Sequence, residues 1–452
     1  MEKYEAAVLV KHRAFVQLKT ALQEMMPADI AQLLSELIEE QDEFGEKEFT
    51  LIFRVLPKEL AAEAFTYMDS DLQMVLINAI SDRELRAVLD ELFLDDTVDI
   101  IEEMPANVVS RILKATDPDK RKQINELLNY PEDSAGSIMT TEFVYFRKED
   151  SVREAFERIR SVGVVKETVY TCYVTDNRRL VGRVSLLDLV VADEDAVIED
   201  IMDSTVVSVY THDDQEAVAN LLAKHGLAAI PVVDKENRIV GIITFDDVMD
   251  VIREENAEDM AMMSAVMPSE ESYFKTSVWK HARSRIVWLL VLMLSATLTG
   301  AITNHFEAQI AAIPLLVSFM PMLTGTGGNC GSQSSTMVIQ GMAMDEIRLK
   351  DFFKVVFKEF RIAIICSIIL SAVNFGRIVL FYHDVKIAAV VSVTLVGTVI
   401  LSKLLGCMLP MLAKKIHIDP AIMSAPLLST LVDSCSTLLY FTIALHVLDF
   451  PA

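Results

Sequence analysis

The feature that most constrains this chain is an abrupt change of charge and hydropathy near Ser272. Residues 1–271 carry 57 Asp and Glu against 27 Lys and Arg, whereas residues 272–452 carry 9 against 14. Such a chain suits two solvents, with an acidic water-soluble half and an apolar half whose segments are long enough to cross a bilayer. The acidic excess argues against nucleic acid as a partner and favours cations.

The apolar half divides into five segments, and about 20 apolar residues are needed to cross the hydrocarbon core. We therefore predict an all-α transmembrane domain of five helices over residues 276–452. Most Lys and Arg residues flank one side of these segments, which predicts a cytoplasmic N-terminal half and a C-terminus outside. The five segments cover residues 286–304, 308–344, 362–383, 387–413 and 420–448.

Residues 1–130 have apolar residues at helical spacing and a recurrence of 12 residues. Each recurring apolar residue precedes a polar or proline-containing segment typical of a helix start. Short helices that share a buried seam form a solenoid, so an all-α superhelical domain is predicted, with an ordinary helical bundle as the alternative. The recurring residues are Leu56, Met68, Ile80, Leu92 and Met104.

A second repeat lies within residues 131–249, which we predict to form an α/β domain. The segments 137–140 and 200–203 match, as do the Val-Gly endings that finish in Ser185-x-x-Asp188 and Thr244-x-x-Asp247. This repeat resembles a tandem pair of cystathionine-β-synthase (CBS) modules. In that family the Ser/Thr-x-x-Asp ending can hold an adenosine nucleotide, which implies ATP at Ser185 and Asp188. The alternative is that these residues only cap the following helices.

An acidic stripe follows the second module, where we predict a connecting helix over residues 250–275. Carboxylates spaced by three or four residues share one helix face, and like charges at this spacing destabilise a helix unless cations neutralise them. Mg²⁺ prefers such oxygen ligands. A solvated acidic face is the alternative. The stripe comprises Asp247, Asp250, Glu254 and Glu258, with Glu255 and Asp259 beside it.

The apolar half contains polar groups at bilayer depth. Asn329 and Gln333 lie among four glycines in the second segment, which favours a cavity lining, although a helix-packing seam would explain the glycines alone. Asp433 is the only acid at the centre of a predicted span. A carboxylate there costs about 2.5–3.5 kcal/mol on insertion scales and therefore indicates an ion path. A structural salt bridge with Lys403 is the alternative.

The order of these parts resembles the MgtE family of bacterial magnesium channels over nearly the whole chain. The resemblance rests also on Gly-Gly-Asn-x-Gly-x-Gln at 327–333 and on Asp419-Pro-Ala followed by Asp433. It implies a homodimeric Mg²⁺ channel in the cell (inner) membrane, in which Asp433 of both subunits holds hydrated Mg²⁺. No P-loop, H-E-x-x-H motif or nucleophile with a placed base is present in the sequence, so catalysis is not expected.

The resemblance further implies that cytoplasmic acids bind regulatory Mg²⁺ and close the channel. Ala425 and Ser436 depart from residues frequent in the family, which leaves pore width and fine selectivity open. Two other functions stay open: a membrane-anchored nucleotide sensor, and a channel for Co²⁺ or Mn²⁺, although the absence of His beside Asp433 favours a hard ion. The implied sensor acids are Glu59, Glu91, Asp95, Asp214, Glu216, Asp247, Asp250, Glu255, Glu258 and Asp259.

Overall fold

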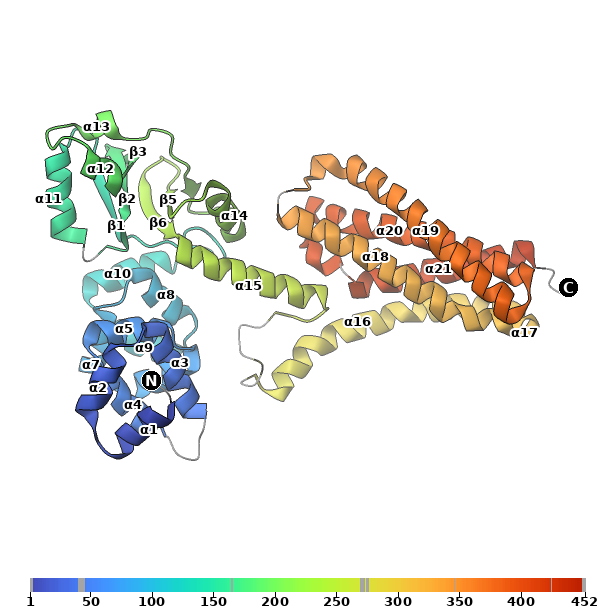
Figure 1. The fold of residues 1–452 in the computed structure, drawn as a ribbon, viewed down its shortest axis with the longest axis horizontal. Helices are drawn as coiled ribbons and strands as arrows, with labels where there is room; N and C mark the ends of the chain where they lie inside the picture. The colour runs from blue at the N-terminus through green and yellow to red at the C-terminus, as the bar shows by residue number, and fades with distance from the viewer. Residues whose placement is uncertain are drawn as a thin grey trace. The chain divides into compact units, whose positions relative to one another are not determined.

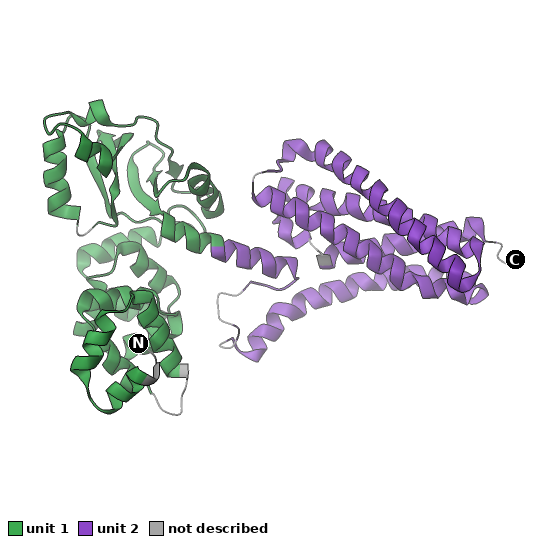
Figure 2. Ribbon diagram, viewed as in Figure 1, with its two compact units in different colours: residues 1–252 green, residues 253–452 purple. Residues whose placement is uncertain are grey.

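The structure is a computed structural model that describes residues 3–39, 45–163, 166–268, 273, 276–344, 346–423 and 425–448. The chain forms two compact units, residues 1–252 and 253–452, which are described separately (Figures 1 and 2). Ser272, where the charge changes, and part of the predicted connecting helix lie outside the described residues. The division into four domains at residues 130, 249 and 275 stays a prediction.

The first unit begins with a domain of short helices. They contact their next-but-one neighbours, α3 with α5, α4 with α6, α5 with α7 and α7 with α9, as the helices of a solenoid do. The helices are α1 (Lys3–Lys11), α2 (Phe15–Gln23), α3 (Pro27–Glu39), α4 (Glu46–Val55), α5 (Lys58–Thr66), α6 (Ser70–Ala79), α7 (Asp82–Leu89), α8 (Leu94–Glu102), α9 (Ala106–Ala115) and α10 (Pro118–Leu127).

The 12-residue recurrence corresponds to the helix boundaries of this domain. Every recurring apolar residue is buried and lies between the end of one helix and the start of the next. After Met68 and Ile80 the next residue caps the following helix: Asp69 accepts a hydrogen bond from the backbone N–H of Leu72, and Ser81 forms a capping box with Glu84. The prediction of a superhelical all-α domain is confirmed.

The CBS pair consists of two three-stranded sheets of the same topology, in which a parallel pair is followed by an antiparallel one. The alternation of buried and exposed residues in β3 is typical of a strand with one face on the core. The elements are β1 (Phe143–Arg147), α11 (Val152–Val162), β2 (Thr168–Asp176), β3 (Arg179–Ser185), α12 (Leu186–Val191), α13 (Ile198–Ile201), β4 (Val209–Tyr210), α14 (Gln215–His225), β5 (Ala229–Val233) and β6 (Ile239–Thr244).

Each module's sheet is completed by the segment that precedes the other module. Thr140 pairs with Ile242 of β6, and Asp203 pairs with Arg183 of β3, through reciprocal backbone hydrogen bonds of 2.9 Å. A Cβ on Gly182 or Gly241 would lie within 3 Å of a methionine sulfur of the pairing segment, which explains the glycine in both repeats. The repeated segments found in the sequence are therefore exchange contacts that hold the two modules together.

Helix α15 (Phe245–Met263) starts directly after β6. The predicted connecting helix was wrong at both ends, because α15 begins five residues earlier than residue 250 and the described residues after Met263 are not helical up to Pro268. Thr244 and Asp247 explain the early start, since the Asp247 carboxylate accepts hydrogen bonds from the Thr244 N–H and hydroxyl and so nucleates the helix.

The second unit is helical. Four of its helical segments are long and apolar enough to cross a membrane, within the part of the chain that the structure describes. The 24 residues of α18 also suffice for a crossing, at about 1.5 Å per residue. The elements are α16 (Val278–His305), α17 (Glu307–Ala312), η2 (Pro314–Phe319), α18 (Met320–Ala343), η3 (Leu349–Asp351), α19 (Phe352–Tyr382), α20 (Val385–Lys415), η4 (Pro420–Met423) and α21 (Ala425–Val447).

The predicted second segment, residues 308–344, is not one helix but α17, η2 and α18 in succession. Pro314 and Pro321 account for the breaks, because proline removes a backbone donor and is tolerated in the first turn of a new helix. The central core of this unit is formed by α18, α20 and α21, which pack closely on one another. No residue of α16 is buried. The count of five spans stays a prediction.

Candidate functional site: a polar helix face and an acid cluster

Helix α18 has two faces of different chemistry. Gly327, Gly328 and Gly331 are buried, whereas Asn329 and Gln333 are exposed on the opposite side, four residues apart and therefore one turn from each other. The exposed line continues to Gln340. The glycines therefore form a packing seam and the two amides lie on an exposed polar face, while the lining of a cavity by Asn329 and Gln333 stays a prediction.

The glycine seam has a direct steric cause. A Cβ on Gly327 would lie 2.7 Å from a Val432 side-chain carbon of α21, and a Cβ on Gly406 of α20 would collide with the carbonyl oxygen of Gly331. The backbones of α18 and α20 therefore approach more closely than any larger residue permits. This close packing fixes α18 between α20 and α21 and turns its amides outward.

Asp433 lies near the middle of α21 and is half-buried. Within the described residues, the structure gives its carboxylate no hydrogen bond and no ion pair. Polar side chains occupy the same helix on either side of it, since Thr430 contacts Ser295 and Ser434 contacts Thr299 of α16 through hydroxyl hydrogen bonds of 3.4 and 2.8 Å. Asp433 is thus an acid in an apolar helix without a protein counter-charge.

Lys403 is not the partner of Asp433. Its ammonium lies 3.9 Å from the carboxylate of Glu359 on α19 and donates a hydrogen bond of 3.2 Å to the Ser334 hydroxyl. The predicted alternative of a Lys403–Asp433 salt bridge is therefore wrong. The sequence placed Glu359 outside the third span, whereas α19 begins at Phe352 and carries Glu359 into the helix.

A second group of acids lies in the first unit, where α8, the start of β2 and the start of α15 meet. Asp95 is only 7% exposed, and one of its carboxylate oxygens has no hydrogen-bond partner among the described residues. The Oε2 atom of Glu167 is likewise buried and unpartnered. Asp96 and Asp247 complete this acid cluster, which we define as Asp95, Asp96, Glu167 and Asp247.

Burial and mutual repulsion raise the pKa values of all four members. Burial, followed by the charge of Asp247, raises the pKa of Asp96 to about 6 and that of Glu167 to about 8. The same causes raise the pKa of Asp95, and burial raises the pKa of Asp247 despite its hydrogen bonds with Thr244. Lys120 is the nearby cation, and its ammonium already donates to the carbonyls of Leu89 and Leu92. Raised pKa values mean that these carboxyl groups hold protons more readily than exposed ones do, because burial disfavours their charged form and the protein places too little positive charge beside them.

In the second unit, the carboxylates of Asp259 and Asp419 interact electrostatically. Burial and then the charge of Asp419 raise the pKa of Asp259 on α15, and Glu258 adds to the effect. Asp419 belongs to the short segment between α20 and η4, where its carboxylate accepts a hydrogen bond from the Ala421 N–H. The acidic helix α15 is therefore coupled electrostatically to the loop that leads into α21.

The other predicted sensor acids are dispersed. Glu59 on α5 and Glu91 after α7 are exposed, and Asp214 caps α14 by accepting from the Ala217 N–H. Glu216, Asp250 and Glu258 are exposed, and Glu255 is partly buried. Across the described ranges, no three His, Cys, Asp or Glu side chains are arranged to hold a metal ion. Glu167 was missed because a lone glutamate before β2 of the first module belongs to no motif.

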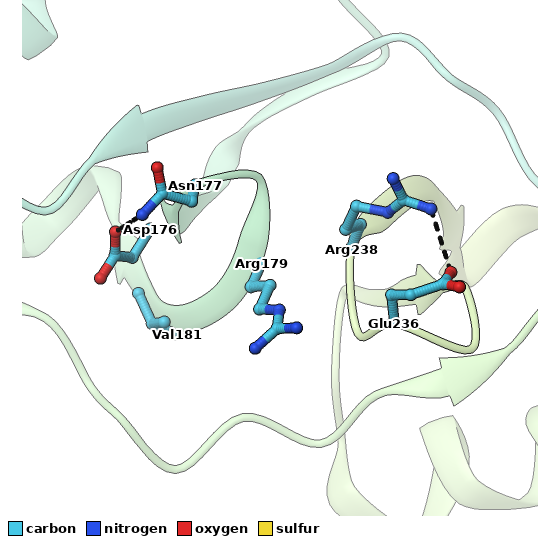
Figure 3. A pocket seen from close by; sticks show the side chains of 6 residues that line it. All are labelled: Asp176, Asn177, Arg179, Val181, Glu236 and Arg238. Atoms are coloured by element: carbon cyan, nitrogen blue, oxygen red, sulfur yellow. Dashed lines mark hydrogen bonds and ion pairs between the residues drawn. The ribbon is translucent and has the colours of Figure 1, made fainter.

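Ser185 and Asp188 form a capping box at the start of α12. The Ser185 hydroxyl donates a hydrogen bond of 2.6 Å to the Asp188 carboxylate, and the Asp188 N–H donates one of 3.1 Å to the Ser185 hydroxyl. An open pocket of 660 Å³ lies elsewhere, between the β2–β3 and β5–β6 turns, where Figure 3 shows Arg179 and Arg238 on the two turns. Arg238 pairs with Glu236 at 3.0 Å, whereas Asp176 pairs with Lys148, and neither Ser185 nor Asp188 lines the pocket.

This combination of an apolar helical unit with a polar face and an acidic unit with paired CBS modules defines a membrane transporter of divalent cations. Residues 320–443 match the family described as divalent cation transporter, and residues 25–133 match the MgtE intracellular N domain. Residues 135–195 and 198–254 each match the CBS domain. The predicted order of domains is thereby confirmed.

Known relatives identify the family over the whole length. The chain is 36% identical to the magnesium transporter MgtE of Thermus thermophilus over 96% of its own length and 95% of the relative. It is 30% identical to the Bacillus subtilis MgtE over 89% of its length and 92% of the relative. The chain belongs to the MgtE family of magnesium transporters.

Solved structures match the first unit. A crystal structure of the soluble part of a magnesium transporter is 28% identical, with a TM-score of 0.51, and covers 57% of this chain and all of that one. The cytosolic domain of the Mg²⁺ channel MgtE in complex with ATP is 35% identical, with a TM-score of 0.49, over 54% of this chain and 99% of that one.

Proposed function

We propose that this protein is a homodimeric Mg²⁺ channel of the cell (inner) membrane whose cytoplasmic unit senses Mg²⁺. Membership of a magnesium transporter family supports the ion. The observation that carries the pathway is the exposed polar face of α18, with Asn329 and Gln333. Uncharged amides at membrane depth need water or another protein surface, because lipid offers no hydrogen-bond partners.

Asp433 is the pore ligand in this proposal. Its carboxylate lacks a protein counter-charge in the described structure, and Mg²⁺ keeps several waters while it is held by one or two carboxylates. Two copies, one from each subunit, would give a hydrated ion the charge that it requires, with the amides of Asn329 and Gln333 as hydrogen-bond partners for its waters. The basic flanks of the apolar segments support a cytoplasmic N-terminus and a C-terminus outside.

The acid cluster supports the sensor. Asp95, Asp96, Glu167 and Asp247 come from the helical domain, the first module and α15, so a divalent ion among them would tie three parts of the unit together. Without cations their repulsion loosens this junction. Mg²⁺ shifts the population toward a compact, closed state only because it binds that state more tightly. Asp259 and Asp419 also repel each other, and a cation between them would link α15 to the segment before α21 in the same way.

ATP at the CBS pair is a second proposal. The exposed side chain of Asp188 at the start of α12 supports it, although the capping box that Asp188 forms with Ser185 is also what the alternative of helix capping predicts. Binding of labelled ATP by the purified protein tests it directly.

The decisive experiment for transport is uptake into liposomes by the purified protein, with Mg²⁺, Ca²⁺, Co²⁺ and Mn²⁺ compared. Asp433→Asn preserves the size of the side chain and removes the charge. We expect it to abolish Mg²⁺ flux while the protein still elutes as folded oligomer. Normal flux through this variant would refute the role of Asp433, and faster uptake of Co²⁺ or Mn²⁺ than of Mg²⁺ would refute the assignment of the ion.

A further inference from the structure

Three buried polar side chains meet inside the helical unit and link α18, α19 and α20. The Ser334 hydroxyl donates a hydrogen bond of 2.6 Å to the Glu359 carboxylate. The Lys403 ammonium donates one of 3.2 Å to the same hydroxyl and lies 3.9 Å from Glu359. Ser334 is 1% and Lys403 5% exposed, and 12% of the Glu359 side chain is exposed, so the triad is largely shielded from solvent.

Burying such charged and polar groups in an apolar domain costs free energy. A buried charge is tolerated only with a partner, and replacing an entire buried ion pair by apolar residues often leaves a protein equally stable. The triad is therefore poorly explained by stability alone. Its position suggests another reason, because it lies at the crossing of the helix that carries Asn329 and Gln333.

Two contacts, about one turn apart, set this crossing. Gly331 lies against Gly406, backbone to backbone, and three residues along each helix Ser334 meets Lys403. The glycine contact determines how closely α18 and α20 approach. The polar contact is directional, since a hydroxyl between an ammonium and a carboxylate allows only one rotation of α18 about its axis.

We propose that Lys403 and Glu359 are positioning residues of the permeation path. They hold Ser334 and so fix the rotation of α18, which determines where Asn329, on the exposed face of the same helix, presents its amide. This inference rests on the proposed function, in which that face lines the pore. The triad does not contact the ion, and it acts on selectivity through the placement of the polar face.

The test uses the full-length protein in liposomes and measures the Mg²⁺-to-Ca²⁺ permeability ratio together with Mg²⁺ flux. Lys403→Met or Glu359→Met alone leaves one uncompensated buried charge and should lower the folded yield. The double variant Glu359→Met/Lys403→Met removes both charges and should fold. We expect the double variant and Ser334→Ala each to shift the permeability ratio by about fivefold or more, because the hydrogen bonds that fix the rotation are lost.

Ser367→Ala is the matched control. Ser367 is a buried hydroxyl of α19 whose one hydrogen bond among the described residues goes to the Ile364 carbonyl of its own helix, so its loss should leave the ratio unchanged. Lys403→Arg keeps the charge and should retain a ratio nearer to that of the wild type. If either Ser334→Ala or the double variant keeps the wild-type ratio, the inference is overturned. Conduction by Asp433→Asn would instead overturn the proposed function itself.

Discussion

Glu167→Gln isolates the electrostatic cost of the acid cluster. The pKa of Glu167 is about 8 in the folded protein against an ordinary value of 4.5. Because the folded value is the higher one, the folded state binds more protons than the unfolded chain between these limits. The free energy of unfolding therefore falls as pH rises from about 4.5 to about 8. An uncharged glutamine removes this dependence at one position.

The size of the effect follows from the shift. At about pH 7.5 the buried carboxyl costs at most about 4 kcal/mol, because the folded protein holds a proton that the unfolded chain releases over about three pH units at 1.36 kcal/mol each. Partial solvent exposure of Glu167 and its coupling to Asp247 reduce this figure. We expect Glu167→Gln to stabilise the cation-free protein by about 2 kcal/mol at about pH 7.5, and by less than about 1 kcal/mol near pH 5.

The assay is urea unfolding of residues 1–263, which contain the first unit with its own core and the whole of α15. Glu157→Gln on α11 is the control, since Glu157 is exposed and lies outside the cluster. Millimolar Mg²⁺ should stabilise the wild-type fragment and stabilise Glu167→Gln less. An equal gain for Glu167→Gln at both pH values, or a loss of stability at the higher one, would refute the account of the cluster.

Three other expectations concern gating, packing and nucleotide binding. Neutralising Asp247, Asp250, Glu255 and Glu258 together should leave flux in liposomes insensitive to Mg²⁺ on the cytoplasmic face; closure at millimolar Mg²⁺ would count against the sensor. Gly406→Ala should destabilise the helical unit by about 1–3 kcal/mol through its collision with Gly331, measured as a lower melting temperature in detergent, whereas Gly376→Ala, which meets open space, should not. Ser185→Ala with Asp188→Asn should abolish ATP binding measured by calorimetry, and unchanged binding would place the nucleotide elsewhere.

Local patterns in the sequence predicted much of this fold. The 12-residue recurrence worked because burial and capping coincide at the same boundaries, as at Ser81 and Ile80. The CBS repeat worked because both glycines are demanded by a methionine-containing partner segment. The first pattern depends on neighbours a few residues apart and the second is a repeat within the chain, so a single sequence contains both.

Pairing between helices could not be predicted in the same way. Lys403 and Glu359 lie 44 residues apart in the chain, and their contact depends on the depth and rotation of α19 and α20. Counting Glu359 with the preceding basic loop also shortened α19 in the prediction. The sequence did not predict Glu167 as a site residue for a related reason, since only folding brings it near Asp247 and Asp96.

The partners of the acids in the apolar half support the role proposed for Asp433. Asp351 pairs with Lys354, Glu359 with Lys403, and Asp384 caps α20 by accepting from the Ile387 N–H. The protein thus neutralises or hydrogen-bonds these three acids, and Glu307 and Glu346 are exposed. For Asp433, at the centre of α21, the described residues provide no such partner, although the cost of an unpaired carboxylate is greatest there. A carboxylate kept in that condition calls for a counter-charge from outside the chain, which is the role that we propose for a hydrated divalent cation.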